Sequence, residues 1–130
     1  MASVLFLTYC SAQKAPIERG RADEVYASIR VRAFVRVCRE LGAPYGFVSG
    51  LFGIVMGWEE IPRYDHRLTR EDIERLLPRV RQRLRQYRRI VFYKPRPLEG
   101  NLYLELLRRA AGRRLRVVHR VAELRRYLAS

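Results

Sequence analysis

A continuous apolar run near the amino terminus, residues 3–9 (Ser-Val-Leu-Phe-Leu-Thr-Tyr), constrains the fold of this chain more than any other stretch. An uninterrupted run of this kind is typical of a central parallel strand that is buried on both faces of a sheet. Three further stretches have the character of strands, at residues 45–48, 89–93 and 114–119. The last of them alternates at its start, so we expect it at or near an edge of the sheet.

Segments with helical spacing separate these strands. Gly42 ends the first of them, and Thr69, followed by acidic residues, is placed to cap the second. Pro78 lies inside the second pattern and predicts either a kink or a new helix that starts there. The helices expected are 29–41, 69–87, 98–111 and 121–128, and residues 15–22, which carry Pro and Gly, are expected to form a loop.

Strands that alternate with helices predict parallel pairing with right-handed crossovers. The fold class is therefore α/β. We expect a three-layer α/β/α sandwich on a four-stranded parallel sheet, with the strands in the order 2-1-3-4. The length of 130 residues is that of one domain, so residues 1–130 are expected to form a single unit.

Several function classes find no support in the sequence. There is no GxGxxG, GxxxxGK[ST], HExxH or CxxC motif, and Cys10 and Cys38 are the only cysteines. His66 and His119 are isolated, so we expect no metal site and no cofactor. The amino terminus lacks the pattern of a signal peptide and the apolar runs are too short to cross a membrane. A cytoplasmic protein is expected.

The formal net charge is +14, and all of the excess lies in the second half of the chain. Residues 75–130 hold 17 of the 27 basic residues and only three of the 13 acidic ones. This asymmetry indicates a polyanionic partner, with nucleic acid (RNA first) or a nucleotide-like small molecule as the leading classes. Thermophile-style surface chemistry is the alternative. The candidate nucleic-acid-binding residues are Arg79, Arg83, Arg85, Arg88 and Arg96.

In a parallel sheet, ligands bind beyond the carboxyl ends of the strands. The polar or small residues that follow the predicted strands are therefore candidates for a ligand site. They are Cys10, Ser11 and Lys14 after the first strand, Ser49 and Gly50 after the second, Lys94 and Arg96 after the third, and His119 and Arg120 after the fourth.

The segment 47–69 adds candidates of mixed chemistry, because its glycines allow close backbone approach and its aromatics offer stacking surfaces. The candidates are Phe52, Gly53, Trp58, Tyr64 and Asp65. The alternative is an irregular connection whose aromatic side chains cover the sheet.

Two of these residues could carry chemistry. Lys14 could act as a nucleophile or as an anion clamp, although a loop lysine is more often solvated. Asp65 could act as a general acid or base, or read a base edge. An ion pair with the neighbouring Arg63, His66 or Arg67 is the simpler interpretation.

The order of short motifs resembles a group of small α/β domains. The motifs are Cys10-Ser11-x-x-Lys14, Tyr26-x-Ser28, Ser49-Gly50-Leu51-Phe52-Gly53-Ile54-Val55 and Ile61-x-x-Tyr64-Asp65-x-x-Leu68-Thr69. The group includes YaaA-like proteins and the lysine-bearing domain of archaeosine synthase, which are similar in fold to uracil-DNA glycosylases. The resemblance implies that Lys14 matches the lysine that attacks the nitrile of a 7-cyano-7-deazaguanine base, with Tyr64 and Asp65 at the base pocket.

Three functions follow as hypotheses. The first is a module that binds a nucleobase or nucleic acid, linked to RNA or DNA base modification, with stacking by Tyr64, Trp58 or Phe52 and phosphates held by the basic half. The second is a stand-alone enzyme that acts on a nucleotide or deazapurine-like substrate through Lys14. The third is a basic subunit that interacts with a protein. The sequence leaves open whether any bond is made or broken.

Overall fold

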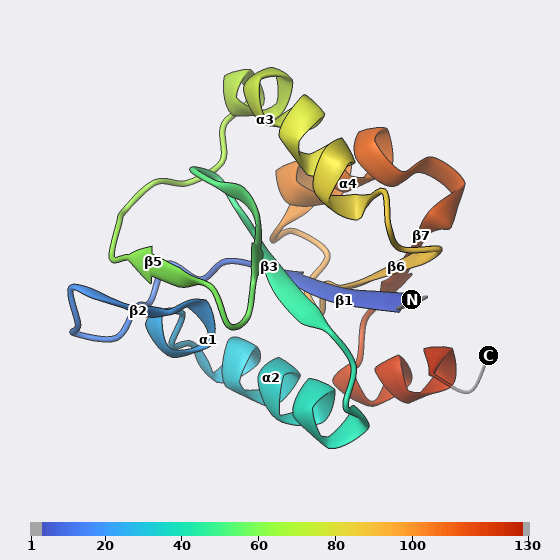
Figure 1. Cartoon of the computed structure of the whole chain (residues 1–130), viewed down its shortest axis with the longest axis horizontal. Helices are drawn as coiled ribbons and strands as arrows, with labels where there is room; N and C mark the ends of the chain where they lie inside the picture. Colours follow the sequence, from blue (N-terminus) through green and yellow to red (C-terminus); the bar gives the residue numbers. More distant parts are fainter. Residues whose placement is uncertain (1–3, 129–130) are drawn as a thin grey trace.

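The computed structural model describes residues 4–128, which form an α/β protein (Figure 1). Strands and helices alternate along most of the chain, as the sequence predicts. The elements in chain order are β1 Val4–Tyr9, β2 Arg19–Arg21, α1 Ala22–Val25, α2 Ile29–Leu41, β3 Tyr45–Ser49, β4 Gly53–Met56, β5 Glu60–Pro62, α3 Arg70–Leu84, β6 Arg89–Tyr93, α4 Asn101–Ala111, the 3₁₀ segment η1 Gly112–Arg114, β7 Leu115–Val118 and the 3₁₀ segment η2 Val121–Tyr127.

The main sheet has five strands in the order β4-β3-β1-β6-β7. Its four parallel strands are the four that the sequence predicts, and their relative order is also as predicted, with β1 between β3 and β6. The prediction of a four-stranded, purely parallel sheet is wrong because β4 pairs antiparallel with β3. The side chain of Ser49 accepts hydrogen bonds from the backbone of Leu51 and Phe52, which tightens the turn that sends β4 back along β3.

Helices cover both faces of this sheet: α2 and η2 lie on one face, and α3 and α4 on the other (Figure 1). Ser28 caps α2 by accepting from the backbone of Val31, and Gly42 ends it in the left-handed conformation. Thr69 and Asp72 form a capping box at the start of α3. Within residues 4–128, no helix has the length and apolar character to cross a membrane.

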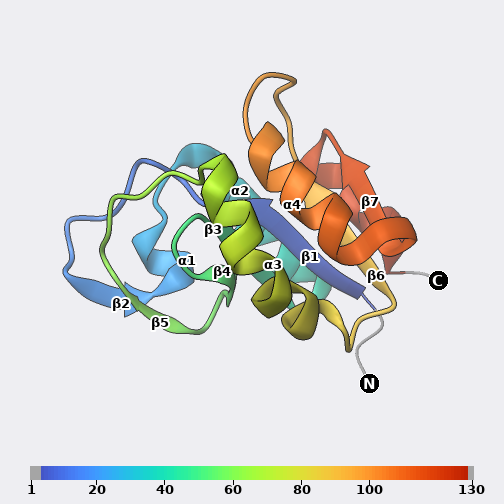
Figure 2. The ribbon, with the colours of Figure 1, turned by 90° about the horizontal axis from the view of Figure 1, so that it is seen from above.

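Of the two outcomes predicted at Pro78, a new helix is excluded, because α3 continues through this residue. Two other local predictions need correction. The expected helix over 121–128 is a 3₁₀ segment. Residues 15–22 were expected to be a loop, but they include β2, which pairs with β5 in a small separate sheet beside the main one (Figure 2). These differences arise because short elements depend on tertiary partners rather than on local spacing.

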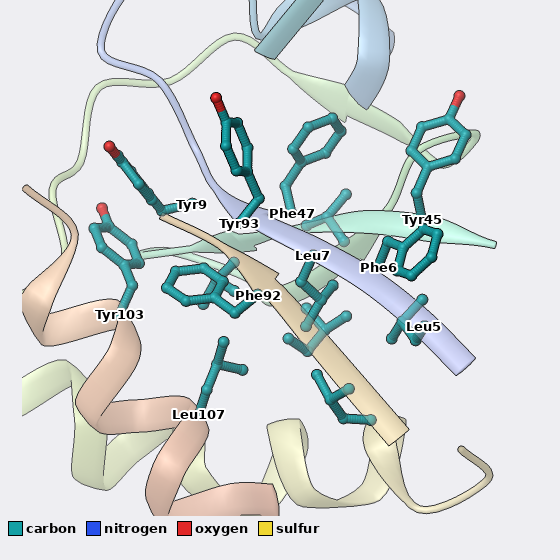
Figure 3. Packing of buried hydrophobic residues seen from close by; sticks show 14 of the residues in the cluster. Leu5, Phe6, Leu7, Tyr9, Tyr45, Phe47, Phe92, Tyr93, Tyr103 and Leu107 are labelled. Atoms are coloured by element: carbon teal, nitrogen blue, oxygen red, sulfur yellow. The ribbon is translucent and has the colours of Figure 1, made fainter. Parts of the chain in front are cut away.

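The core is continuous across the sheet, and all six residues of β1 are buried in it. Three tyrosines, Tyr9, Tyr93 and Tyr103, lie at the carboxyl end of β1 and β6 (Figure 3). The strand β7 is one of the two edge strands of the sheet. There, the guanidinium of Arg116 donates to the carbonyl oxygens of Arg113 and Leu115 at 2.7 and 2.9 Å.

Candidate functional site

A cleft of about 960 Å³ opens at the carboxyl ends of β1 and β6. The chain leaves β1 toward β3 on one side of the sheet and later returns to β6 on the other, so the cleft lies where the strand order reverses. Ligands of open α/β sheets bind at such a switch point. The cleft is lined by the loop after β1, by the first residues of α2 and α4, by residues 65–68 and by the loop after β6. We call it the carboxyl-edge cleft.

Arg30 stands on the first turn of α2, and its guanidinium is held in the cleft by contacts with the protein. Its guanidinium lies 3.6 Å from the ring centroid of Tyr9 and donates to the Thr8 hydroxyl at 2.7 Å and to the Cys10 carbonyl at 3.3 Å. Thr8 in turn donates to the carbonyl of Tyr93, which ties the arginine to both central strands. Burial lowers the pKa of Arg30, but a guanidinium stays charged.

Arg30 forms no ion pair with a carboxylate among residues 4–128, although the charge of Glu99 acts to raise its pKa. Two of its five N–H donors are used in the contacts with Thr8 and Cys10, so three remain for a ligand. A half-buried charge of this kind carries a desolvation cost that an anion in the cleft would offset.

Lys14 enters the cleft from the loop after β1. Its ammonium donates to the carbonyl of Ser11 at 2.8 Å and lies 4.9 Å from the ring centroid of Tyr64. Like Arg30, it has no carboxylate partner within the described part of the chain. Since Arg30 and Lys14 hold the consecutive carbonyls of Cys10 and Ser11, their charged groups lie on the order of 10 Å apart.

A network of hydroxyl groups fixes the aromatic surface behind Lys14. The oxygen of Ser49 accepts two backbone N–H groups, so its own proton is directed to the Tyr64 hydroxyl, 2.6 Å away. The hydroxyl groups of Tyr64 and Tyr26 also share a hydrogen bond, and the ring of Phe52 packs edge-on against Tyr64 with 5.2 Å between the ring centroids. Burial raises the pKa of Tyr64, so the network stays protonated at neutral pH. Ser49, Phe52 and Tyr64 thus hold a platform for Lys14 rather than line the cleft.

Cys10 and Ser11 border the cleft, but their side chains are engaged with the protein. The sulfur of Cys10 lies 3.4 Å from the Tyr103 hydroxyl, which also accepts from the backbone of Leu68. The Ser11 hydroxyl donates to the carbonyl of Gln13 at 2.5 Å. These contacts shape the loop after β1. In this loop Lys14, rather than Cys10, carries the group that can meet a ligand in the cleft.

Asp65 lines the cleft and is exposed, and it forms no ion pair within residues 4–128. The neighbouring His66 instead contacts Asp72 at 2.7 Å. Burial alone raises the pKa of Asp72, but hydrogen bonds from Thr69, Arg75 and His66 outweigh it and hold the pKa well below its ordinary value. The ion pair that could have occupied Asp65 is thus absent from the described chain, which leaves its carboxylate available.

The loop after β6 contributes one charged pair and one internal brace. Arg96 lines the cleft and is paired with Glu99 at 2.8 Å. Lys94 is buried and donates to the carbonyls of Arg96 and Pro97 at 2.7 and 3.0 Å. Lys94 therefore holds the shape of the loop and lies outside the cleft.

Other candidates from the sequence lie away from the cleft. A side chain at Gly50 would come within 2.5 Å of the Leu68 backbone, and Gly53 has a positive φ of 81° at the start of β4, so both glycines serve the chain path. Trp58 is 55% exposed, and the adjoining Gly57 donates to the carbonyl of Tyr45 at the start of β3. Trp58 is thus at the amino edge of the sheet, opposite the cleft.

The arginines predicted to bind nucleic acid are also far from the cleft, except for Arg96. Arg79, Arg83 and Arg85 border a shallow groove of about 590 Å³ on α3, together with Gln82 and Gln86. Arg88 directly precedes β6, so it lies at the amino edge, a strand length of about 15 Å from the cleft. Glu59 pairs with Arg83 at 2.6 Å, whereas Arg79, Arg85 and Arg88 have no carboxylate partner among residues 4–128. We call these three the α3 arginine face.

Among the cleft residues that the sequence reasoning missed are Arg30, Tyr9, Tyr93 and Tyr103. Arg30 had a usable signal, because it follows the capping Ser28 at the start of a crossover helix, and such helix starts face the carboxyl edge of the sheet. The tyrosines carried no comparable signal, because their spacing is that of ordinary core residues.

Comparison of the chain with models of protein families, with curated proteins and with solved structures finds no match. The resemblance to YaaA-like and archaeosine-synthase domains therefore stays a prediction. Within residues 4–128 no group of histidine, cysteine and acidic side chains is placed to hold a metal ion.

Proposed function

We propose that the protein binds a small nucleotide-like ligand, a heterocyclic base that carries phosphate, in the carboxyl-edge cleft. The observation that carries the proposal is the pair of cations, Arg30 and Lys14, which face one cleft at the switch point without a carboxylate partner in the described chain. Arg67 and Arg96 add positive charge to the same walls, against Asp65 and Glu99. The cleft therefore favours an anion.

The rim of the cleft is apolar, which supports a ligand with a flat ring in addition to its charge. Ile29 is 85% exposed and Leu98 is 92% exposed, and both border the opening. Large apolar side chains exposed beside a charged pocket are typical of binding sites. The proposed resemblance to domains that act on deazapurine bases favours the same ligand class, with Asp65 free to contact the base.

Calorimetric titration of 5′-nucleoside monophosphates, the matching nucleosides and ribose 5-phosphate tests the proposal. We expect saturable binding of at least one monophosphate, weaker binding of its nucleoside, and a loss of several-fold in affinity for both in Leu98→Ser. Arg85→Gln, which removes a charge from the α3 arginine face, serves as the control and should bind as the wild type does. If no nucleotide or nucleoside binds, the proposal is wrong.

A second function is favoured by the α3 arginine face, which is exposed and free of carboxylate partners within the described residues. We infer that this face can track the phosphates of a single-stranded RNA. Fluorescence anisotropy with a labelled oligonucleotide tests it: binding should weaken when Arg79, Arg85 and Arg88 are changed together to Gln. Equal binding by the wild type and the triple variant would contradict it.

A further inference from the structure

The contacts around Tyr9 assign a position to the phosphate group within the cleft. This inference rests on the proposed function and names the part of the protein that recognises the charged end of the ligand. Tyr9 ends β1 and lines the cleft, and its side chain is contacted by residues from two other elements, α2 and the start of α4.

The hydroxyl of Tyr9 is buried and has no hydrogen-bond partner among residues 4–128. The residue as a whole is 5% exposed. An unpaired buried hydroxyl is costly, and such groups in a folded protein need an explanation. A core role alone would be met better by phenylalanine, which has the same ring and no polar atom to satisfy.

Two groups beside the Tyr9 ring are donors with free capacity. The carboxylate of Glu99, which adds to burial in raising the pKa of Tyr9, is the one acidic group within residues 4–128 that acts on it. The guanidinium of Arg30 is stacked on the ring at 3.6 Å from its centroid, with three N–H groups unused. Gly100 lies so close that an added Cβ would come within 2.8 Å of the ring. Gly100 is the N-cap of α4 and supplies no side-chain cap, so the first amides of this eleven-residue helix keep their positive end for a ligand.

We propose that Arg30, the Tyr9 hydroxyl and the first-turn amides of α4 form a phosphate subsite. A phosphate monoester presents several acceptor oxygens and carries negative charge, so it satisfies all three sets of donors together. Burial raises the pKa of Tyr9, which keeps its hydroxyl a donor at neutral pH. Lys14, in the loop after β1, and Asp65, in the segment before α3, also line the cleft. Both remain available for the rest of the ligand.

The test is an NMR titration of the full chain with inorganic phosphate at constant ionic strength, followed by backbone and arginine side-chain signals. In the wild type we expect saturable shifts at residues 28–31 and 100–103. Arg30→Gln should weaken phosphate binding by about tenfold or more. Arg30→Lys should weaken it less, because lysine keeps the positive charge but lacks the forked N–H donors of the guanidinium. Arg113→Gln, at an exposed arginine of η1 that borders neither the cleft nor the groove on α3, is the matched loss of charge and should leave phosphate binding unchanged.

Tyr9→Phe separates recognition from folding. Removing an unpaired buried hydroxyl should leave the unfolding temperature unchanged or raise it, while phosphate affinity falls several-fold. The subsite is wrong if Arg30→Gln and Arg113→Gln bind phosphate equally, or if Tyr9→Phe binds it as tightly as the wild type. Binding of a nucleoside in the cleft with no saturable binding of phosphate would overturn the subsite and leave the proposed function standing.

Discussion

The carboxyl-edge cleft and the α3 arginine face both present cations without carboxylate partners in the described chain, but they hold them differently. Arg30 and Lys14 are partly buried, donate to fixed carbonyl and hydroxyl groups, and stand over tyrosine rings. The three arginines of the α3 arginine face are exposed. Under the two proposals, the first arrangement would select one ligand geometry, and the second would attract any polyanion. Net charge alone reveals only the second.

The largest expected effect concerns Gly100, at the wall of the carboxyl-edge cleft. If the cleft is rigid, a substitution at its wall should be strongly destabilising. Gly100→Ala places a side chain in the left-handed conformation, with φ of 79°, and presses it against Tyr9. We expect a loss of about 3 kcal/mol in the free energy of unfolding, from backbone strain and overpacking together. Urea denaturation measures it.

Gly42→Ala is the matched control for this substitution. Gly42 is also left-handed, with φ of 65°, but an added Cβ meets no atom within 4 Å. It should lose only about 1 kcal/mol. Equal losses at the two glycines would show that the cleft wall is no tighter than an ordinary helix end.

The two regions should also differ in their response to salt. Changing Arg79, Arg85 and Arg88 to Gln should lower the affinity for single-stranded RNA by about tenfold and reduce the slope of log K against log salt by about 2. Nucleotide affinity in the cleft should not change, because none of these arginines lines the cleft. Anisotropy at several salt concentrations checks the first part and calorimetry the second. A fall in both affinities would mean that the regions act as one surface.

The smallest expected effect concerns Asp72, which supports the cleft wall through His66. Its pKa is lowered in the folded protein, so its contribution is complete above the ordinary pKa of about 4 and is lost as the pH falls below that value. Asp72→Asn should cost about 1 kcal/mol at pH 7, the usual effect of a lost helix cap. The difference from the wild type should shrink below pH 4, as measured by urea denaturation. A difference that is constant with pH would contradict this assignment.

The sequence was most informative where local patterns and the fold agree. The buried run of β1, the cap at Thr69 and the glycine at position 42 each act through neighbouring residues, so their elements are found where they were expected. The strand β4 was missed because its four residues depend on pairing with β3. Taken alone, the short apolar run of β4 did not distinguish a strand from a loop.

The same reasoning explains which site residues could be anticipated. Lys14, Asp65 and Arg96 follow the rule that strand ends and their loops carry ligands, and all three line the cleft. Lys94 follows the rule as well, but its ammonium turns inward to two carbonyls, which no spacing could show. The role of Tyr9 depends on a missing hydrogen bond, and that is a property of the packed structure alone.

The edge strand β7 has a consequence for the behaviour of the protein in concentrated solution. Its sequence is Leu-Arg-Val-Val, which without the arginine would be an entirely apolar strand. An open edge strand is a template for pairing with a strand of another molecule. Arg116 occupies carbonyls of its own strand region and puts a charge on that edge. A charge at this position disfavours pairing of the edge with another molecule, as charged residues beside apolar strands do in general.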